Sequence, residues 1–386
     1  MTSNADHLPH NADSVMQAAD QFAQRHLVPH AAQWGRGHFE RKALFESAGA
    51  AGLMGLQVPL EWGGMALPFA DKAKVLHKLA QTDFSAAMAL VNSHNVVAQL
   101  AKASPHTLAP LYAGNLMRGL MVACTALTEP GAGSDLGHIQ TTAVRQGEGW
   151  LLNGEKTWII NAAHADAVVV YAQTQTGAGV KGIAAFLALA DTPGFERVAV
   201  STHTALSSMG IGGLRLTNVY CDASHLVYAP GEAFVDIMSA INRARTYVAA
   251  MCCGMVCQAL SDVREYGQKR TAFGQSLEQF QGWRWQVAQA ATALQAAELM
   301  VSEACDRIDR GLDVQSAAAQ AKLYATSMAQ AQLGALLHAM GAEGFLDHYA
   351  FLRHLTAAHA ASLTDGSTAM LLERVAHDLR FKPGAC

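Results

Sequence analysis

A glycine-rich loop that leads into strands rather than into a helix is the feature that most constrains this sequence. Residues 126–135 read Ala-Leu-Thr-Glu-Pro-Gly-Ala-Gly-Ser-Asp and follow an apolar segment at 120–124. Short β-branched or aromatic runs come after the loop, with glycines between them. A dinucleotide-binding fingerprint needs a helix N-terminus after its glycines, and none is predicted here. The loop is therefore either a ligand-binding backbone surface or an ordinary hairpin turn.

Strand-like runs occupy the middle of the chain, and helical periodicity flanks them. Strands are predicted at 141–144, 150–152, 157–160, 167–171, 183–189 and 214–220. The main helices are predicted at 41–51, 69–81, 85–101, 107–117, 233–267, 277–311 and 313–340. Because no crossover helix separates the strands, an antiparallel β-barrel or sandwich is favoured over a βαβ sheet. The predicted fold class is α+β, with an N-terminal all-α domain (1–122), a middle β domain (123–231) and a C-terminal helical bundle (232–386).

Composition excludes several classes of protein. Hydrophobic residues make up 51% and charged residues 15%, which favours a compact chain over a disordered one. A net charge of −4 offers no basic surface for nucleic acid or an anionic membrane. The apolar run at 247–260 is too short to span a bilayer. No signal peptide is evident, and a cytoplasmic location is expected.

The cysteines do not indicate a metal site. Of the seven, Cys252, Cys253 and Cys257 lie close together, but inside a helical pattern with no histidine at ligand spacing. We therefore interpret them as buried free thiols and predict no metal.

Two segments together resemble the flavin-loop signature of the acyl-CoA dehydrogenase family: the loop at 126–135 and Leu-Asn-Gly-Glu-Lys-Thr-Trp-Ile at 152–159. The α, β, α order matches that family over nearly the whole chain. The resemblance implies FAD as cofactor, with contacts from Leu127, Thr128, Gly133, Ser134, Trp158 and Ile160; Ser134 is also expected to contact substrate. The chain departs from the family at Ile160, where a Thr or Ser hydroxyl usually bonds the flavin N5 edge, and at His138, which replaces a small residue.

Two further motifs resemble cofactor-binding segments of the same family. In Arg270-Thr-Ala-Phe273-Gly-Gln-Ser-Leu-Glu-Gln-Phe-Gln281, the family's arginine comes from a neighbouring subunit and binds the phosphates of FAD. His338 and Gly341 belong to a turn that approaches the adenosine half of FAD, although a glycine-ended helix cap also explains Gly341. The resemblance thus implies a homo-oligomer, a dimer or tetramer, whose cofactor sites are shared between chains.

The substrate residues implied by the resemblance are Asn92, Asn242 and Arg245. Asn92 lies on the helix that lines the family's acyl pocket, and it indicates a polar or short acyl group unless it faces solvent or bonds the backbone. Asn242 and Arg245 match a helix position near the substrate thioester. Arg245 is followed by a long uncharged run, so it is expected to be buried and paired.

Asp365 is the predicted catalytic base. The run Leu-Thr-Asp-Gly-Ser-Thr at 363–368 resembles the family's Glu-Gly-Thr/Ser segment, with Asp365 one methylene shorter than the glutamate and Ser367 beside the flavin. The family's alternative base position is occupied by Ala244. A plain Asp-Gly turn is the alternative reading. A carboxylate held out of water has its pKa raised towards the range useful for proton abstraction.

These features predict FAD-dependent α,β-dehydrogenation of a short or polar acyl thioester, carried on CoA or on a carrier protein. A carboxylate removes the Cα proton, and hydride passes from Cβ to the flavin, which an electron-transfer flavoprotein or oxygen reoxidises. Because Asp365 and Ile160 both depart from the family pattern, three alternatives stay open. They are nitroalkane-oxidase-like chemistry, non-oxidative desulfination or elimination, and an inert flavin-binding scaffold.

Overall fold

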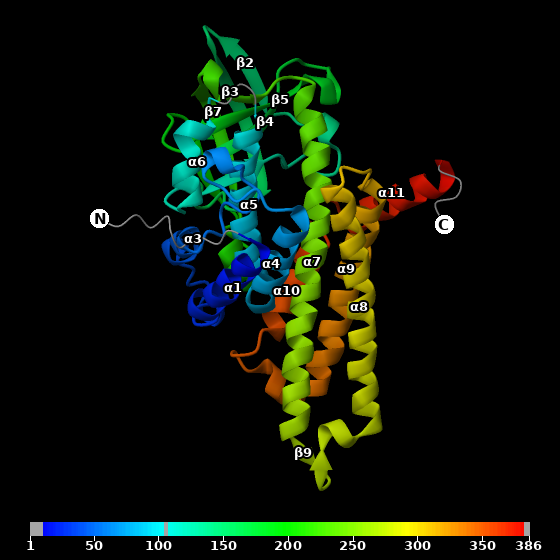
Figure 1. The fold of residues 1–386 in the computed structure, drawn as a ribbon. Coiled ribbons are helices and arrows are strands. Elements are labelled where there is room, and N and C mark those ends of the chain that lie inside the picture. Colours follow the sequence, from blue (N-terminus) through cyan, green and yellow to red (C-terminus); the bar gives the residue numbers. More distant parts are fainter. Residues whose placement is uncertain (1–10, 104–106, 382–386) are drawn as a thin grey trace. The chain divides into compact units, whose positions relative to one another are not determined.

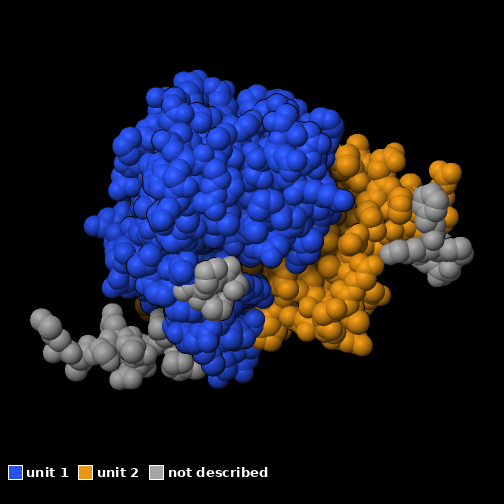
Figure 2. Space-filling model, turned by 90° about the horizontal axis from the view of Figure 1, so that it is seen from above, with its two compact units in different colours: residues 1–22, 37–67, 88–240 blue, residues 23–36, 68–87, 241–386 orange. Residues whose placement is uncertain are grey.

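The computed structural model describes residues 11–103 and 107–381 (Figure 1). The chain forms two compact units, distinguished by colour in Figure 2. Unit 1 comprises Met1–Phe22, Gly37–Leu67 and Met88–Ala240, and unit 2 comprises Ala23–Arg36, Pro68–Ala87 and Ile241–Cys386. This division groups segments that are distant in sequence, so it does not test the predicted domain boundaries, which stay a prediction.

The α-helices of unit 1 come from both ends of its sequence. They are α1 (Ala12–Phe22), α3 (Arg41–Ala50), α6 (Ala109–Met117) and parts of α5 (Phe84–Lys102) and α7 (Glu232–Lys269). Short 3-10 helices are η3 (Leu60–Trp62), η4 (Leu136–His138), η5 (Gly179–Gly182), η6 (Thr204–Met209) and η7 (Ala223–His225). A reciprocal cap begins α1: the Ser14 amide donates to Asn11 Oδ1 (2.9 Å), and the Asn11 amide donates to Ser14 Oγ (3.1 Å). Such caps satisfy amides that have no partner within the helix.

Eight strands of unit 1 form one sheet. They are β1 (Ala123–Ala126), β2 (Thr142–Gln146), β3 (Gly149–Ile159), β4 (Ala167–Gln173), β5 (Ile183–Leu189), β6 (Phe195–Ala199), β7 (Gly212–Cys221) and β8 (Leu226–Tyr228). Their order is β6-β7-β3-β2-β4-β5-β8, with β1 on β4. Pairing is antiparallel except at β1–β4 and at one β2–β4 residue pair, so the sheet is mixed rather than purely antiparallel.

The predicted strands at 150–152 and 157–160 are two parts of the single strand β3. Its pairing with β7 shifts register between Leu152 and Gly154 and again between Lys156 and Ile159. At Gly154 the backbone has φ +151°, and a Cβ there would lie 2.5 Å from Thr141 Oγ1. The glycine therefore allows a bulge inside one strand, where the sequence suggested a break.

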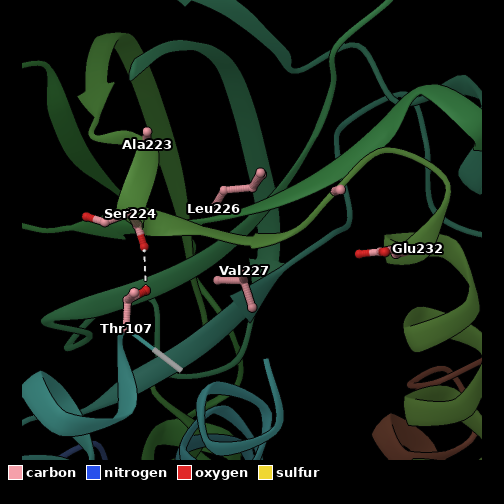
Figure 3. Close-up of a pocket in the computed structure, with 7 residues that line it drawn as sticks. Thr107, Ala223, Ser224, Leu226, Val227 and Glu232 are labelled. Carbon is pink, nitrogen blue, oxygen red and sulfur yellow. Dashed lines mark hydrogen bonds between the residues drawn. The ribbon is translucent and has the colours of Figure 1, made fainter. Parts of the chain in front are cut away.

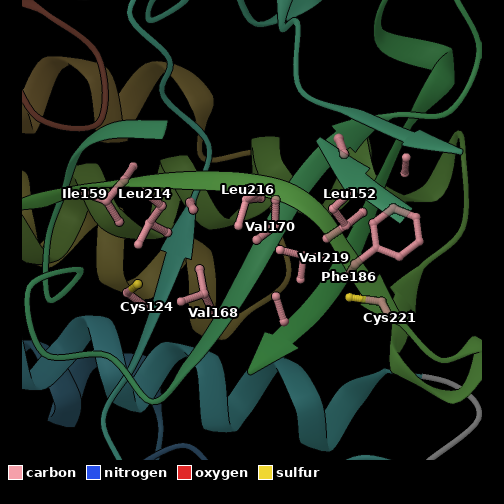
Figure 4. Packing of buried hydrophobic residues seen from close by; sticks show 14 of the residues in the cluster. Cys124, Leu152, Ile159, Val168, Val170, Phe186, Leu214, Leu216, Val219 and Cys221 are labelled. Atoms are coloured by element: carbon pink, nitrogen blue, oxygen red, sulfur yellow. The ribbon is translucent and has the colours of Figure 1, made fainter. Parts of the chain in front are cut away.

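A hydrophobic core packs against one face of this sheet (Figure 4). Val168 and Val170 of β4 point into it from alternate positions, and Phe186 joins them from β5. All three are fully buried. Burying a side chain of this size contributes about 1.5–3 kcal/mol, so the core stabilises the pairing of β4 with β5 in unit 1.

Unit 2 is helical. Its elements are η2 (Ala23–Leu27), α2 (Ala31–Trp34), α4 (Phe69–Thr82), the start of α5, the rest of α7, a hairpin of β9 (Thr271–Ala272) and β10 (Gln275–Ser276), η8 (Leu277–Gln279), α8 (Gln281–Asp309), α9 (Gln315–Met340), η9 (Gly341–Phe345), α10 (Phe351–Ala361) and α11 (Thr368–Phe381). The amides of Phe69 and Ala70 donate to the Asp309 carboxylate (2.6 and 3.0 Å). A carboxylate from α8 therefore caps the N-terminus of α4.

The helix α7 is longer than the apolar run seen in the sequence. It has 38 residues and a window of mean hydropathy 1.3, long and apolar enough to cross a membrane. However, 78% of that window is buried inside the protein, and the core helix of a soluble protein passes the same test. The length of this helix is therefore weak evidence for a membrane span.

We expect Gly254→Ala to destabilise the protein, although alanine favours helices over glycine by about 1 kcal/mol. A Cβ at Gly254 of α7 would lie 2.1 Å from the His77 carbonyl oxygen of α4, so the two helices would have to move apart. Gly334 of α9 has no such neighbour within 4 Å, and Gly334→Ala is the matched control. The midpoint of thermal unfolding should fall for Gly254→Ala and hold or rise for Gly334→Ala. Equal midpoints would contradict the packing of α4 on α7.

Candidate active site

The glycine-rich loop is fixed to β3 by a buried ion pair. Lys156 Nζ of β3 donates to the Leu127 carbonyl oxygen (2.9 Å) and to Glu129 Oε1 (2.8 Å). The Thr157 amide donates to the Thr128 carbonyl oxygen (3.0 Å). Three consecutive loop residues are thus bonded to one strand.

The Glu129 carboxylate is bonded on several sides. Besides Lys156, it accepts hydrogen bonds from the amides of Gln140 (2.5 Å) and Thr141 (3.0 Å). Burial alone would raise the pKa of Glu129, but Lys156 and these donors hold it below its ordinary value. Burial lowers the pKa of Lys156 to about 8, against the opposing effect of Glu129. A buried pair with this many partners makes the loop rigid.

The tip of the loop is open for a ligand. Gly133 and Ser134 are exposed, and within residues 11–103 and 107–381 neither forms a hydrogen bond or ion pair. A Cβ at Gly131 would meet nothing within 4 Å. Exposed amides and a hydroxyl on a fixed loop suit the carbonyl and phosphate oxygens of a flavin dinucleotide, so these residues fit FAD.

Trp158 presents an unusually exposed indole. Its side chain is 61% exposed, and its backbone has φ +58°, a left-handed conformation that is strained for a bulky residue. The register shift at the end of β3 accounts for this geometry. An exposed flat aromatic surface beside the loop also fits a flavin ring. Ile160, two residues later, is half-buried and has no side-chain donor.

Asp365 lies in a strained turn held by two cations. Its backbone has φ +51°, and Gly366 follows with φ +103°. Arg245 Nε donates to the Asp365 carbonyl oxygen (3.1 Å). Lys322 Nζ donates to the carbonyl oxygens of Thr364 and Gly366, the latter at 2.6 Å. The turn thus has a defined shape, and a plain surface Asp-Gly turn does not describe it.

The carboxylate of Asp365 is available to take a proton. It is half-buried, and in the part of the chain that the structure describes no donor bonds its oxygens. Burial raises the pKa of Asp365, while Lys322 and Arg245 oppose that rise. A carboxylate with a raised pKa and no committed lone pair is suited to general-base work.

Asn242 and Arg245 are buried, and they bond each other as well as the turn. Arg245 Nη1 donates to Asn242 Oδ1 (3.1 Å), which confirms that Arg245 is buried and paired. Burial lowers the pKa of Arg245 despite the nearby Asp365. Ser367 follows directly on the turn and is half-buried. The structure therefore brings Asn242, Arg245, Asp365 and Ser367 together.

The polar residues of α5 bond backbone groups. Asn92 Nδ2 donates to the Met88 carbonyl oxygen (3.2 Å) within the same helix. Ser93 Oγ accepts from the Ala123 amide (3.0 Å), and His94 Nε2 accepts from the Gln57 amide (3.1 Å). These contacts favour the structural alternative for this group, and the substrate role of Asn92 stays a prediction.

Another set of predicted cofactor residues gathers at the other end of the long helices of unit 2. The hairpin β9–β10 places Phe273 at its tip with φ +49° and the side chain 97% exposed. Arg270 and Gln281 flank the hairpin, and both are exposed. Trp283 Nε1 donates to the Ala339 carbonyl oxygen (3.3 Å), which links the start of α8 to the end of α9. The exposed His338 and the left-handed Gly341 (φ +59°) therefore lie at this same end.

The residues around the Asp365 turn and the residues around the hairpin β9–β10 are far apart in one chain. Arg245 and Arg270 are separated by 25 positions along and just beyond α7. At 1.5 Å per residue this corresponds to about 37 Å. Arg270 therefore cannot contact a small ligand at the Asp365 turn of its own chain.

Other features of the described residues carry no sign of chemistry. Figure 3 shows a small pocket of unit 1 lined by Thr107, Ala223, Ser224, Leu226, Val227, Ala229 and Glu232. None of these is a predicted site residue. Cys252 and Cys253 are free thiols and buried as expected, with pKa values raised by burial, to about 12 for Cys252, whereas Cys257 is a free thiol that is only half-buried. Within the described ranges, no three His, Cys, Asp or Glu side chains gather as a metal site.

Comparison with known protein families identifies the fold. Three family models, "Acyl-CoA dehydrogenase, N-terminal domain", "middle domain" and "C-terminal domain", match residues 10–115, 124–219 and 233–379. The chain belongs to the acyl-CoA dehydrogenase family. The predicted family and α+β architecture are thereby confirmed, as is the assignment to the flavin-dependent oxidoreductases.

Individual relatives extend over nearly all of this acyl-CoA dehydrogenase family member. The mitochondrial short-chain specific acyl-CoA dehydrogenase of Homo sapiens is 29% identical over 362 residues, 94% of this chain and 88% of that protein. A solved FAD complex of PigA is 25% identical, with a TM-score of 0.89 over 96% of this chain and 97% of that one. Butyryl-CoA dehydrogenase from Megasphaera elsdenii, at 24% identity and a TM-score of 0.91 over 96% and 98%, shares the fold. FAD is thus confirmed as a cofactor within the family.

Sequence reasoning missed Glu129, Lys156 and Lys322. Glu129 and Lys156 lie inside the two quoted motifs, but nothing in the motifs shows that they pair. Lys322 offered a clearer signal, since it is a lone charge in the run Ala-Ala-Gln-Ala-Lys-Leu-Tyr-Ala at 318–325. A charged residue on an apolar helix face indicates a buried polar partner, which proves to be the Asp365 turn.

Proposed function

We propose that this chain catalyses the FAD-dependent α,β-dehydrogenation of a short or polar acyl thioester. The observation that carries this proposal is the Asp365 turn. It presents a half-buried carboxylate with a raised pKa and open oxygens, on a strained backbone that two cations hold. Such strain is retained at functional sites more often than at ordinary turns.

In the proposed reaction, Asp365 takes the Cα proton of the thioester. The turn orients the carboxylate, and burial raises its pKa towards the range useful for that step, against the opposing effect of Lys322 and Arg245. When bound, FAD supplies the acceptor for the Cβ hydride. Ser134, Asn92, Asn242 and Arg245 remain candidates for substrate contacts, although Asn242 and Arg245 also hold the turn.

The FAD residues that we propose fall into two groups. Leu127, Thr128, Gly133 and Ser134 offer a fixed loop with open amides, and Trp158 and Ile160 offer a flat apolar surface. Ser367, next to Asp365, is a further candidate. Because Ile160 has no hydroxyl, the flavin N5 edge would receive no side-chain donor at that position. We infer that this alters flavin potential or the access of the electron acceptor.

The remaining FAD residues imply a second copy of the chain. Arg270, Phe273, Gln281, His338 and Gly341 lie at one end of the helices of unit 2, with Arg270 about 37 Å from Arg245 along α7. A guanidinium and a bare phenyl ring at an exposed tip suit contact with a partner subunit's cofactor. We therefore propose a dimer or tetramer with shared cofactor sites. We further propose that the protein is located in the cytoplasm and that an electron-transfer flavoprotein reoxidises its flavin.

The test is anaerobic mixing of the purified flavoprotein with a panel of acyl-CoAs of increasing length and polarity. Short or polar members should bleach the flavin absorbance and yield the 2-enoyl product, detected by mass. Carrier-bound acyl groups form a second panel. A flavin that no acyl thioester reduces would remove the proposal.

The nitroalkane alternative has one observation for it and one against it. Nitroalkane oxidases use an aspartate as the base, and Asp365 occupies the corresponding position in this chain. Arg374, however, is offset from the position of their arginine and donates to Asp378 Oδ1 (3.1 Å) one turn along α11. Bleaching by a nitroalkane but by no thioester would favour this alternative.

A further inference from the structure

Lys322 is a buried cation whose nearest partners are not acidic. Its side chain is fully buried, and in the described part of the chain it forms no ion pair at contact distance. Its ammonium donates instead to the carbonyl oxygens of Thr364 and Gly366. Removing an ammonium from water is costly without an ion-pair partner. The hydrogen bonds that the Lys322 ammonium donates to this turn account for its burial here.

These hydrogen bonds determine the backbone conformation of the turn at residues 364–366. Three consecutive carbonyl oxygens, of Thr364, Asp365 and Gly366, accept hydrogen bonds from two cations. Lys322 comes from α9 and Arg245 from α7, so two helices converge on one peptide segment. A left-handed conformation costs less free energy for Asp than for most residues other than glycine, but it still persists best where its surroundings determine it. The two cations provide that determination.

We propose that Lys322 is a positioning residue for Asp365. With Arg245, its ammonium holds residues 364–366 in a turn that keeps the Asp365 carboxylate free of donors and close to positive charge. This inference rests on the proposed role of Asp365 as the base. Lys322 itself has no contact with the reacting atoms in this account.

The charge of Lys322 also bears on the proton affinity of Asp365. Burial raises the pKa of Asp365, and Lys322 and Arg245 lower it. The other groups that act on these cations are Cys252 of α7, facing Lys322, and Arg374 of α11, facing Arg245. A base must be ionised to take a proton, so its activity rises with pH through its pKa. Loss of the Lys322 charge therefore moves that rise to higher pH.

The experiment titrates Asp365 directly and then measures flavin reduction. Infrared difference spectra against pH, compared with those of Asp365→Asn, isolate the carboxyl band of Asp365 without any acyl-CoA. Lys322→Gln keeps an amide donor for one carbonyl and removes the charge; Lys322→Arg keeps the charge. We expect the midpoint to rise by about one unit or more in Lys322→Gln, as for loss of a nearby opposite charge. In Lys322→Arg it should stay near the wild-type value.

The rate of flavin reduction should follow the same shift. At pH values below the midpoint, where the ionised fraction of Asp365 limits the reaction, the rate should fall about tenfold per unit of midpoint shift in Lys322→Gln, and it should recover at higher pH. Arg264→Gln, which removes an exposed cation of α7, is the control and should change neither quantity. Lys322→Met, which also removes the donors, is decisive only if it folds; otherwise Lys322→Gln decides.

An unchanged Asp365 midpoint in folded Lys322→Gln would overturn the inference, even if the rate fell. The two proposals fail separately. If no acyl thioester reduces the wild-type flavin, the proposed function is lost, while the infrared titration still reports whether Lys322 governs the Asp365 carboxyl.

Discussion

Asp365→Asn is expected to slow reduction of the flavin by an acyl-CoA about 10²–10⁴-fold, the usual value of a general base. Asparagine keeps the shape of the side chain and tolerates the left-handed backbone at φ +51°. It cannot accept the Cα proton. The measurement is stopped-flow absorbance of the flavin under anaerobic conditions, with flavin content and thermal unfolding as checks that the variant folds.

Two further variants sharpen this prediction. Asp347→Asn removes an exposed carboxylate that pairs with Arg36, and it should reduce at the wild-type rate. Asp365→Glu retains a carboxylate, so its rate of flavin reduction should exceed that of Asp365→Asn. If Asp365→Asn reduced its flavin at the wild-type rate, Asp365 would not be the base, and the proton would leave by another route.

Lys156→Met is expected to lower the free energy of unfolding by about 3–5 kcal/mol, because it leaves the Glu129 charge buried and unpaired. Lys156 Nζ contacts Glu129 Oε1 at 2.8 Å, and both side chains are almost fully buried. The loop that they fix carries Leu127 and Thr128, so FAD retention should weaken as well. Urea denaturation and flavin content on gel filtration measure the two effects.

The matched control is Lys181→Met, which removes an exposed lysine of the same unit and should change stability by no more than about 0.5 kcal/mol. Adding Glu129→Gln to Lys156→Met removes the stranded charge and should restore part of the loss. If Lys156→Met were as stable as Lys181→Met, the ion pair would not fix the loop.

Much of the fold followed from periodicity. The helices α4 and α7 and the strands β4 and β5 are each continuous in pattern, and the structure has them within a few residues of the predicted bounds. The edge strands β6 and β8 were missed for different reasons: β6 is mostly exposed and has no apolar alternation, and β8 has only three residues, too few to show a pattern. In β3, Gly154 suggested a break, whereas tertiary pairing with β7 made it a bulge.

The site was only partly predictable, because sequence shows residue types and not partners. Asp365 and the glycine loop were found through a motif resemblance. The role of Lys322 could not be predicted from the sequence, because 43 positions separate it from Asp365 and only the packing of α9 brings it to the turn. Asn242 and Arg245 were expected near a thioester. In the structure Arg245 donates hydrogen bonds to Asn242 and to the Asp365 turn. The strain at Trp158 likewise has no signature in the sequence.

The most direct test of the central claim is the isotope dependence of a single flavin reduction. The acyl-CoA that reduces the flavin fastest is prepared with deuterium at Cα or at Cβ, and each form is mixed anaerobically with the protein. If Asp365 removes the Cα proton while the flavin accepts the Cβ hydrogen, either label slows reduction and the product is the 2-enoyl thioester. Reduction at the same rate with deuterium at Cα, or a product that retains the saturated Cα–Cβ bond, would contradict the account.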